Sequence, residues 1–63
     1  MKEYTLTNHR LEKQVSIKAI YVDSEIHKYQ WSFFGTNNNG MVDLLCAYNQ
    51  KEWSITDIKY LEK

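Results

Sequence analysis

Few side chains in this 63-residue chain have the types and spacing that catalysis or metal binding requires. The candidate metal ligands are His9, His27 and Cys46, with no Cys-x-x-Cys motif and no paired histidines. A structural zinc site needs four ligands, and a catalytic site needs three and a water. His27 and Cys46 are expected on one sheet face, but at opposite ends of a strand. We therefore predict no metal site and no cofactor.

Nucleophilic catalysis by Cys46 or a serine would need a neighbouring base and a third group that orients the base. Cys46 is expected among Leu44, Trp31 and Phe33, and apolar surroundings raise the pKa of a thiol and make it inert. No spacing brings two carboxylates together for acid–base work, so we expect solvated charges at Asp23, Glu25, Asp43 and Asp57. The two glycines flank one turn and form no phosphate loop. The sequence therefore predicts a protein that is not an enzyme.

The composition predicts one small domain over residues 1–63. Eight basic and eight acidic residues cancel, so the basic stripe of a polyanion-binding domain is not visible. A chain of this length buries only about 60% of its unfolded surface, and a second subunit is one way to stabilise it. The lone cysteine excludes an internal disulfide and suits a reducing compartment. With no apolar leader and no run of membrane-spanning length, we expect a cytoplasmic protein.

The stretch from Glu25 to Gly35 is expected to be the central strand of an antiparallel sheet. Four rings fall on every second position of it, at His27, Tyr29, Trp31 and Phe33. A strand places alternate side chains on one face, whereas a helix would scatter them. Aromatic residues also suit a pleated, half-buried surface.

The segment Leu11–Val22 alternates as a second strand, and Asp23-Ser24-Glu25 supplies the next turn. A two-residue loop would put Ser16 and Lys18 on the aromatic face. Only a three-residue loop or an equivalent bulge joins two apolar faces. That loop gives these pairs: Val22 with Ile26, Ala19 with Tyr29, and Ile17 with Trp31.

Asn39-Gly40 is a strong hairpin signal, because both residue types tolerate positive φ. Two loop lengths remain open. A tight turn pairs Phe33 with Cys46 and Trp31 with Tyr48, and a four-residue loop from Asn37 to Gly40 pairs Phe33 with Leu44 and Trp31 with Cys46. In both cases Met41 to Tyr48 is a strand whose aromatic face carries Leu44, Cys46 and Tyr48.

The chain ends complete the predicted sheet. Glu3–Thr7 is a short strand with Tyr4 and Leu6 on one face, followed by a turn at Thr7–Arg10 in which Asn8 could instead cap a helical turn. Trp53–Leu61 is expected to be a strand beside Tyr48 and Cys46, with a short helical turn as the alternative. The predicted fold is all-β: one antiparallel meander of four to five strands, coiled into a half-open barrel. With the helical turn, the class would be α+β.

Several apolar side chains fall on the nominally polar face of this sheet. Either the chain ends fold over and bury them, or they form an exposed patch that docks a protein partner. An unpaired edge strand offers a second route to a partner. The partner-binding residues expected from this pattern are Ile20, Val22, Ile26, Lys28, Phe34 and Leu45.

We therefore expect a small, non-enzymatic protein-interaction module. Its abundant Lys, Asn, Ile and Tyr have AT-rich codons, which fits a bacterial or phage accessory or inhibitor protein. The alternative is a small β-barrel that binds single-stranded nucleic acid through Lys18, Lys28 and Gln30 on the polar face. The balanced charge disfavours this alternative, because it supplies little attraction for phosphates. A homo-oligomer would be a further way to cover an exposed face.

Overall fold

The computed structural model describes residues 1–24 and 29–61, and the regular structure in these ranges is all β-strand. No helix occurs in them, and so none that is long and apolar enough to cross a membrane. The all-β prediction is confirmed, whereas the count of four to five strands and the α+β alternative are wrong. The strands are β1 (Lys2–Asn8), β2 (Lys13–Ala19), β3 (Tyr21–Asp23), β4 (Gln30–Thr36), β5 (Val42–Asn49) and β6 (Trp53–Tyr60).

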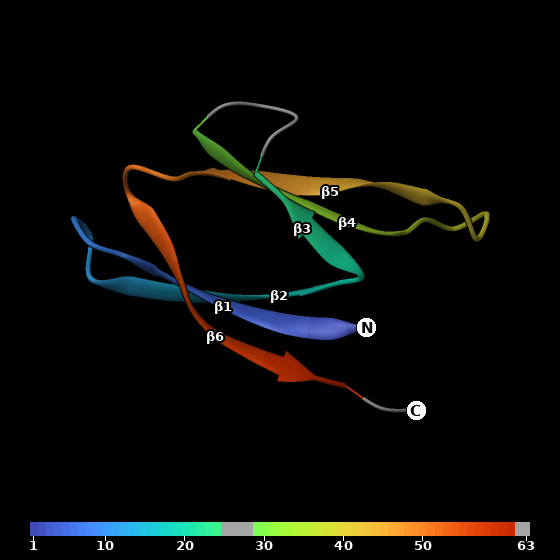
Figure 1. Cartoon of the computed structure of the whole chain (residues 1–63), viewed down its shortest axis with the longest axis horizontal. Coiled ribbons are helices and arrows are strands. Elements are labelled where there is room, and N and C mark those ends of the chain that lie inside the picture. The colour runs from blue at the N-terminus through green and yellow to red at the C-terminus, as the bar shows by residue number, and fades with distance from the viewer. Residues whose placement is uncertain (25–28, 62–63) are drawn as a thin grey trace.

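The six strands form two antiparallel sheets of three, in the orders β2–β1–β6 and β3–β4–β5. Figure 1 shows the sheets as two layers, and the hairpin between β4 and β5 extends past the end of the β2–β1–β6 layer. The sheets do not close into a barrel. As a result, β2, β3, β5 and β6 each lie at a sheet edge.

β1 is the middle strand of its sheet, and its alternate side chains lie on the face that is buried in the core. Tyr4 and Leu6 share one face, as predicted, and the structure buries this face against the other sheet. Asn8 ends the strand, and its Oδ1 accepts hydrogen bonds from the backbone N–H groups of Arg10 and Leu11, at 2.9 and 2.7 Å. A turn is therefore present, but it covers residues 9–12 and not Thr7–Arg10, since Thr7 and Asn8 belong to β1. The Glu12 N–H donates to the Asn8 carbonyl at 3.0 Å, so Asn8 caps this single turn, as in the alternative prediction. The chain then returns as β2.

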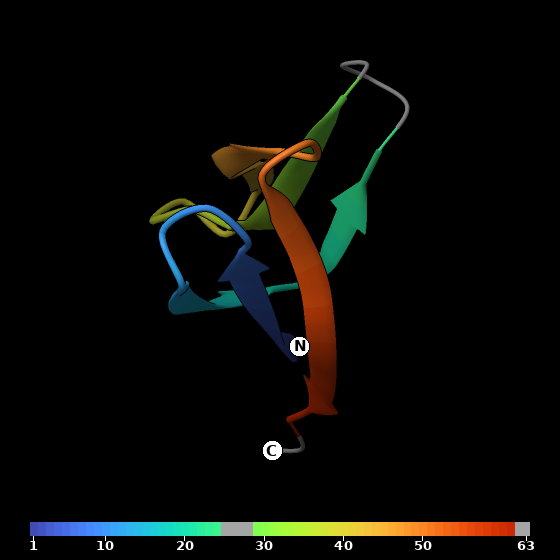
Figure 2. The ribbon, with the colours of Figure 1, turned by 90° about the vertical axis from the view of Figure 1, so that its left-hand side faces the viewer.

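The predicted single strand Leu11–Val22 is split at Ile20 into β2 and β3, which belong to different sheets. Figure 2 shows the chain bending there from the lower layer into the upper one. The Ile20 N–H donates to the Phe34 carbonyl at 2.7 Å, so hydrogen bonding continues through the bend.

The register predicted for this segment is wrong. Val22 pairs with Phe33, and Tyr21 pairs with Phe34. Ile17 pairs with Tyr4 in the other sheet. The physical reason is the bend. The prediction assumed that the whole segment pairs with the next strand in one sheet, whereas the bend divides the segment between two sheets. The pairs that do not form are Ala19 with Tyr29 and Ile17 with Trp31, and the expected partner of Val22, Ile26, lies outside the described residues.

β4 is the predicted central strand, but it begins at Gln30, later than expected. Trp31 and Phe33 pack into the core as predicted, and Phe33 is fully buried. Tyr29 does not, because its φ of 68° places it outside the strand and its side chain is 64% exposed. Bulky residues rarely adopt positive φ, so no alternation rule predicts this reversal. His27, the remaining ring of the predicted aromatic face, lies outside the described residues.

The hairpin between β4 and β5 closes over residues 37–41, where Asn37 N–H donates to the Met41 carbonyl and Gly40 has a φ of 80°. At the end of the hairpin away from this loop, the strands pair in the register predicted for a tight turn, with Trp31 opposite Tyr48. The register then shifts, because Leu45 has no partner on β4 and forms a β-bulge. Leu44 consequently pairs with Phe34 on the outer face, and its predicted place on the aromatic face is wrong.

The C-terminal segment is a strand, but its predicted neighbours are wrong. β6 lies beside β1, with Ile55 opposite Leu6 and Ile58 opposite Tyr4, and it does not extend a meander beside β5. A register shift leaves Thr56 without a partner on β1 and forms a β-bulge in β6. The connection over residues 50–52 therefore crosses between sheets and does not close a hairpin.

The core lies between the two sheets and is small. The Tyr4 and Phe33 rings meet edge-on with centroids 5.3 Å apart, and Tyr48 and Trp53 meet at 5.0 Å. The buried apolar residues are Tyr4, Leu6, Ala19 and Phe33, and half-buried residues packed around them are Val15, Ile17, Val22, Trp31, Cys46, Tyr48, Trp53 and Ile55. Of the residues predicted to face the core, Ile17, Trp31, Phe33 and Cys46 pack there, whereas Tyr29 and Leu44 are exposed.

The accessible surface is large for a protein of this mass. It measures 4829 Å², whereas a compact monomer of 7.6 kDa is expected to expose about 4,300 Å². Ten large apolar side chains are exposed among the described residues, against four buried ones. The fold therefore leaves apolar surface that its own chain does not cover.

Candidate interaction surface

The outer face of the β3–β4–β5 sheet carries apolar side chains on all three strands. Tyr21, Phe34 and Leu44 are cross-strand neighbours, and Val42 lies further along β5, opposite Thr36. Because Phe33 points into the core and side chains alternate along a strand, these residues lie on the face away from it. We call Tyr21, Phe34, Val42 and Leu44 the outer apolar patch.

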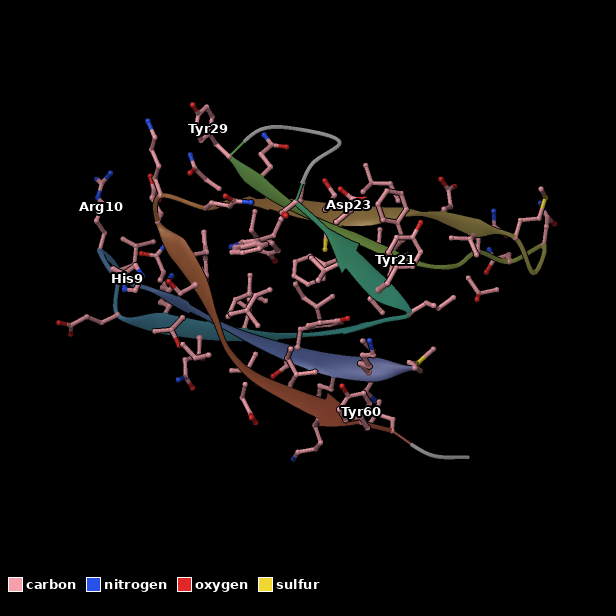
Figure 3. The ribbon with its side chains drawn as sticks, viewed as in Figure 1. His9, Arg10, Tyr21, Asp23, Tyr29 and Tyr60 are labelled. Atoms are coloured by element: carbon pink, nitrogen blue, oxygen red, sulfur yellow. The ribbon has the colours of Figure 1, made fainter. Side chains whose placement is uncertain are left out.

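The geometry of the outer apolar patch is well defined. The Tyr21 and Phe34 rings stack with centroids 4.9 Å apart and an interplanar angle of 14°. Figure 3 shows Tyr21 and Asp23 along β3. Tyr21, Leu44 and Val42 are 40%, 45% and 55% exposed. Contiguous exposed apolar groups of this kind mark interaction sites on soluble proteins, and aromatic rings are favoured anchors within them.

The end of the β4–β5 hairpin adds a second exposed area on the opposite side of the same strands. Leu45 packs against Gly35 so closely that a Cβ on Gly35 would lie 2.6 Å from the Leu45 Cδ1. Gly35 is buried beneath this side chain, yet Leu45 itself is 45% exposed. The reason is that the hairpin extends past the other sheet, as Figure 1 shows.

The zero net charge of the chain conceals an uneven distribution between the sheets. The strands β3, β4 and β5 contain two acids, Asp23 and Asp43, and no lysine or arginine. The strands β1, β2 and β6 contain four lysines and two acids. The sheet that carries the outer apolar patch is therefore acidic, and the opposite sheet is basic.

The structure brings together only some of the residues predicted to bind a partner. Phe34 lies at the centre of the outer apolar patch. Leu45 was expected on the same face, but because of the bulge it lies over Gly35 on the opposite side of the sheet. Ile20 is half-buried at the bend. Val22 is not on the outer face as predicted, because it pairs with Phe33 and packs against the core. The other two predicted residues, Ile26 and Lys28, lie outside the described residues.

The outer apolar patch contains two residues, Tyr21 and Leu44, that simple alternation along the sequence assigns to the core face. The bend before Tyr21 and the bulge after Leu44 each interrupt the alternation. As a result, the side chains of Tyr21 and Leu44 lie on the face opposite to the predicted one. Two apolar doublets, Phe33-Phe34 and Leu44-Leu45, carried the available signal. In a strand, one member of such a doublet must point away from the core.

The residues proposed for nucleic-acid binding do not lie together. Lys18 is on the outer face of the β2–β1–β6 sheet, opposite Glu3. Gln30 is exposed at the start of β4 in the other sheet, opposite Asn49. The two faces point in opposite directions, and Lys28 lies outside the described residues. The described residues therefore assemble no basic groove from this set.

Cys46 is half-buried on the core side of β5, and burial raises the pKa of its thiol. This is the direction expected of a thiol in apolar surroundings. Across residues 1–24 and 29–61, no three His, Cys, Asp or Glu side chains come close enough to hold a metal ion. His9 lies in the turn after β1, Cys46 lies on β5 of the other sheet, and His27 lies outside the described ranges.

A histidine–serine contact was not expected from the sequence. His9 Nε2 and Ser54 Oγ lie 2.6 Å apart, although 45 positions separate the residues. The contact joins the turn after β1 to the start of β6.

A second group of polar and aromatic side chains lies at the opposite end of the molecule from Tyr21. Figure 3 shows Tyr29, His9 and Arg10 there. The Lys51 Nζ lies 5.4 Å from the centre of the Tyr29 ring, and Arg10 pairs with Glu52 at 3.5 Å. These side chains already have partners of their own, so this end is a weaker candidate than the outer apolar patch.

Comparison with known proteins adds no family to this geometry. We find no matching family model, no curated protein with a significant sequence match and no solved structure with a significant structural match. The function is therefore inferred from the exposed side chains of the outer apolar patch.

Proposed function

We propose that this protein is a small, non-enzymatic interaction module that binds another protein through the outer face of the β3–β4–β5 sheet. One observation supports the proposal most directly: stacked aromatic rings and two exposed aliphatic side chains form the outer apolar patch on one regular sheet face. Covering such a patch releases it from water, which is the main favourable term in protein association.

The surrounding structure supports the same reading. The core holds only four buried apolar side chains among the described residues, so the fold has little apolar burial of its own. A half-open barrel, as expected from the sequence, would leave the β5 edge accessible beside the patch. An accessory or inhibitor protein of a phage or mobile element remains the biological setting that the size and codon bias favour.

The experiment compares two lysine substitutions at positions of equal exposure. Leu44 on β5 and Ile58 on β6 are each 45% exposed. Leu44→Lys places a charge in the outer apolar patch, and Ile58→Lys places the same charge on the other sheet. Each variant and the natural chain are used to capture proteins from a host lysate, and the captured proteins are identified by mass spectrometry.

The proposal expects a protein that the natural chain and Ile58→Lys retain and that Leu44→Lys loses. Circular dichroism of each variant controls for folding. Equal retention by all three chains would contradict the proposal. Tight binding of a labelled single-stranded oligonucleotide at low salt, unaffected by Leu44→Lys, would favour the nucleic-acid alternative instead.

A further inference from the structure

Four strands, β2, β3, β5 and β6, have an edge that pairs with no other described strand. β2 and β6 pair only with β1, and β3 and β5 pair only with β4. An open edge presents unpaired N–H and C=O groups, so another extended segment can add to the sheet there. The four edges differ in length and in how they are protected.

Charged side chains protect the β2 and β6 edges better than the β5 edge, and β3 is only three residues long. β2 carries Lys13 and Lys18, and β6 carries Asp57 and Lys59. β5 carries one charge, Asp43, and its residues from Leu44 to Asn49 are all uncharged. Lysine, proline and β-bulges all protect an edge. β5 contains neither lysine nor proline, and since β5 and β6 each have one bulge, their charges distinguish them. The β5 edge is therefore the most receptive of the four.

The side chains along β5 specify what an added strand would meet. Val42 and Leu44 belong to the outer apolar patch on one face. Asp43 points to the other face, because it lies opposite Gly35, and it is exposed. An added strand has the same alternation as β5. It would thus meet apolar groups on one face and a carboxylate on the other.

The geometry points to β5 as the acceptor for an extended segment of a partner protein in which apolar and basic residues alternate. This inference rests on the proposed function and names the class of partner segment. The apolar residues of the segment continue the outer apolar patch beyond Val42 and Leu44, and a basic residue faces Asp43. Main-chain hydrogen bonds along β5 supply affinity, and the alternation supplies specificity.

A second copy of this chain fits the same edge less well. Two copies joined at β5 would bring together two sheets whose strands carry only acidic charges. Like charges brought close across an interface are unfavourable. A basic segment gains attraction at the same place, so a partner of opposite charge is the better match.

The test uses the whole chain and a fluorescein-labelled peptide, Lys-Val-Lys-Ile-Lys-Val, as the probe. Its controls are a peptide with glutamate at each lysine position and a peptide with proline at the central isoleucine. Anisotropy titration at low salt should show the lysine peptide binding about tenfold more tightly than either control. Proline removes a main-chain donor, so its effect reports strand addition and not only charge attraction.

Matched variants locate the binding site. Asp43→Asn should weaken lysine-peptide binding, whereas Asp57→Asn, the same change on β6, should leave it unchanged. Leu44→Lys should abolish binding, and Ile58→Lys should not. Equal effects of Asp43→Asn and Asp57→Asn, equal binding of the three peptides, or no binding of any peptide would overturn the inference. Self-association blocked by Leu44→Lys, without peptide binding, would overturn it in favour of a second copy.

The two proposals fail in different ways. The lysate capture depends on the outer apolar patch, whichever way a partner contacts it. The peptide titration depends on the β5 edge and on the sign of the charge beside Asp43. Capture that is lost in Leu44→Lys, together with no peptide binding, would keep the proposed function and remove strand addition.

Discussion

At the scale of single residues, the contact between Gly35 and Leu45 shows how the bulge in β5 is accommodated. The Leu45 side chain occupies space that a Cβ on Gly35 would need, with the Leu45 Cγ at 3.2 Å and its Cδ1 at 2.6 Å from that position. The absence of a side chain at Gly35 therefore allows the extra residue of β5 to fold back over β4.

We predict that Gly35→Ala lowers the free energy of unfolding by about 1–2 kcal/mol, because Leu45 must leave its present position. In a Leu45→Ala background the same substitution should cost much less, since the obstructing atoms are gone. Urea denaturation of the four chains measures the coupling. Costs that add to within about 0.3 kcal/mol would show that the two residues do not compete for space.

Cys46 gives a residue-scale prediction about pH. Burial raises the pKa of its thiol above the ordinary value of 9.0, so the folded chain holds this proton more firmly than the unfolded chain. The stabilisation is fully present below the ordinary thiol pKa and is lost as the pH rises through the raised value. Cys46→Ala should therefore show a smaller loss of stability on the alkaline side than the natural chain.

Denaturation at several pH values, from neutral to alkaline, measures this difference. Iodoacetamide labelling gives a second readout, because the thiolate is the reactive form. At neutral pH the folded natural chain should react more slowly than the chain unfolded in urea. Equal labelling rates in the two states would contradict a buried thiol with a raised pKa.

At the scale of elements, side-chain alternation predicted most of the strands. The bend at Ile20 and the bulge in β5 account for the side chains whose face was predicted wrongly. Tyr4 and Leu6 in β1, and Trp31 and Phe33 in β4, face the core as the period of two requires. The bend at Ile20 was not predictable, because an apolar residue between two alternating segments looks the same in a straight strand. The side-chain pattern alone shows neither where a strand changes sheets nor which strand pairs with β6.

The candidate surface was predicted only in part for the same reason. Phe34 and Leu45 were identified because alternation places these apolar residues on the nominally polar face, and the structure places only Phe34 there. Tyr21 was not, because it follows the bend, and Leu44 was not, because it precedes the bulge. Where a bend or a bulge determines the sheet face on which a side chain lies, only the structure shows that face.

The hydrogen bond at the bend gives an element-scale prediction. Ile20 N–H donates to the Phe34 carbonyl at 2.7 Å, at the point where β2 passes into β3. Ile20→Pro removes this donor and should lower the free energy of unfolding by about 1–3 kcal/mol more than Ile20→Ala, which keeps it. Thermal or urea denaturation measures both variants. Equal destabilisation by the two substitutions would mean that the bond contributes nothing to the junction.

At the scale of the whole molecule, two features that composition conceals carry the functional argument. The balanced charge divides into a basic sheet and an acidic one. The aromatic residues divide between a small core and an exposed face that includes the stacked Tyr21 and Phe34 rings. The acidic sheet is also the sheet with the outer apolar patch, so exposed apolar groups and acidic side chains occur on the same strands.

Amide hydrogen exchange on the free chain and on the complex recovered from host lysate tests the docking surface most directly. We expect protection on binding at Tyr21, Phe34 and residues 42–45, with the amides of β1 and β6 unchanged. Protection confined to β1, β2 and β6, or an identical exchange pattern in the free and bound chains, would contradict the assignment of the β3–β4–β5 face as the docking surface.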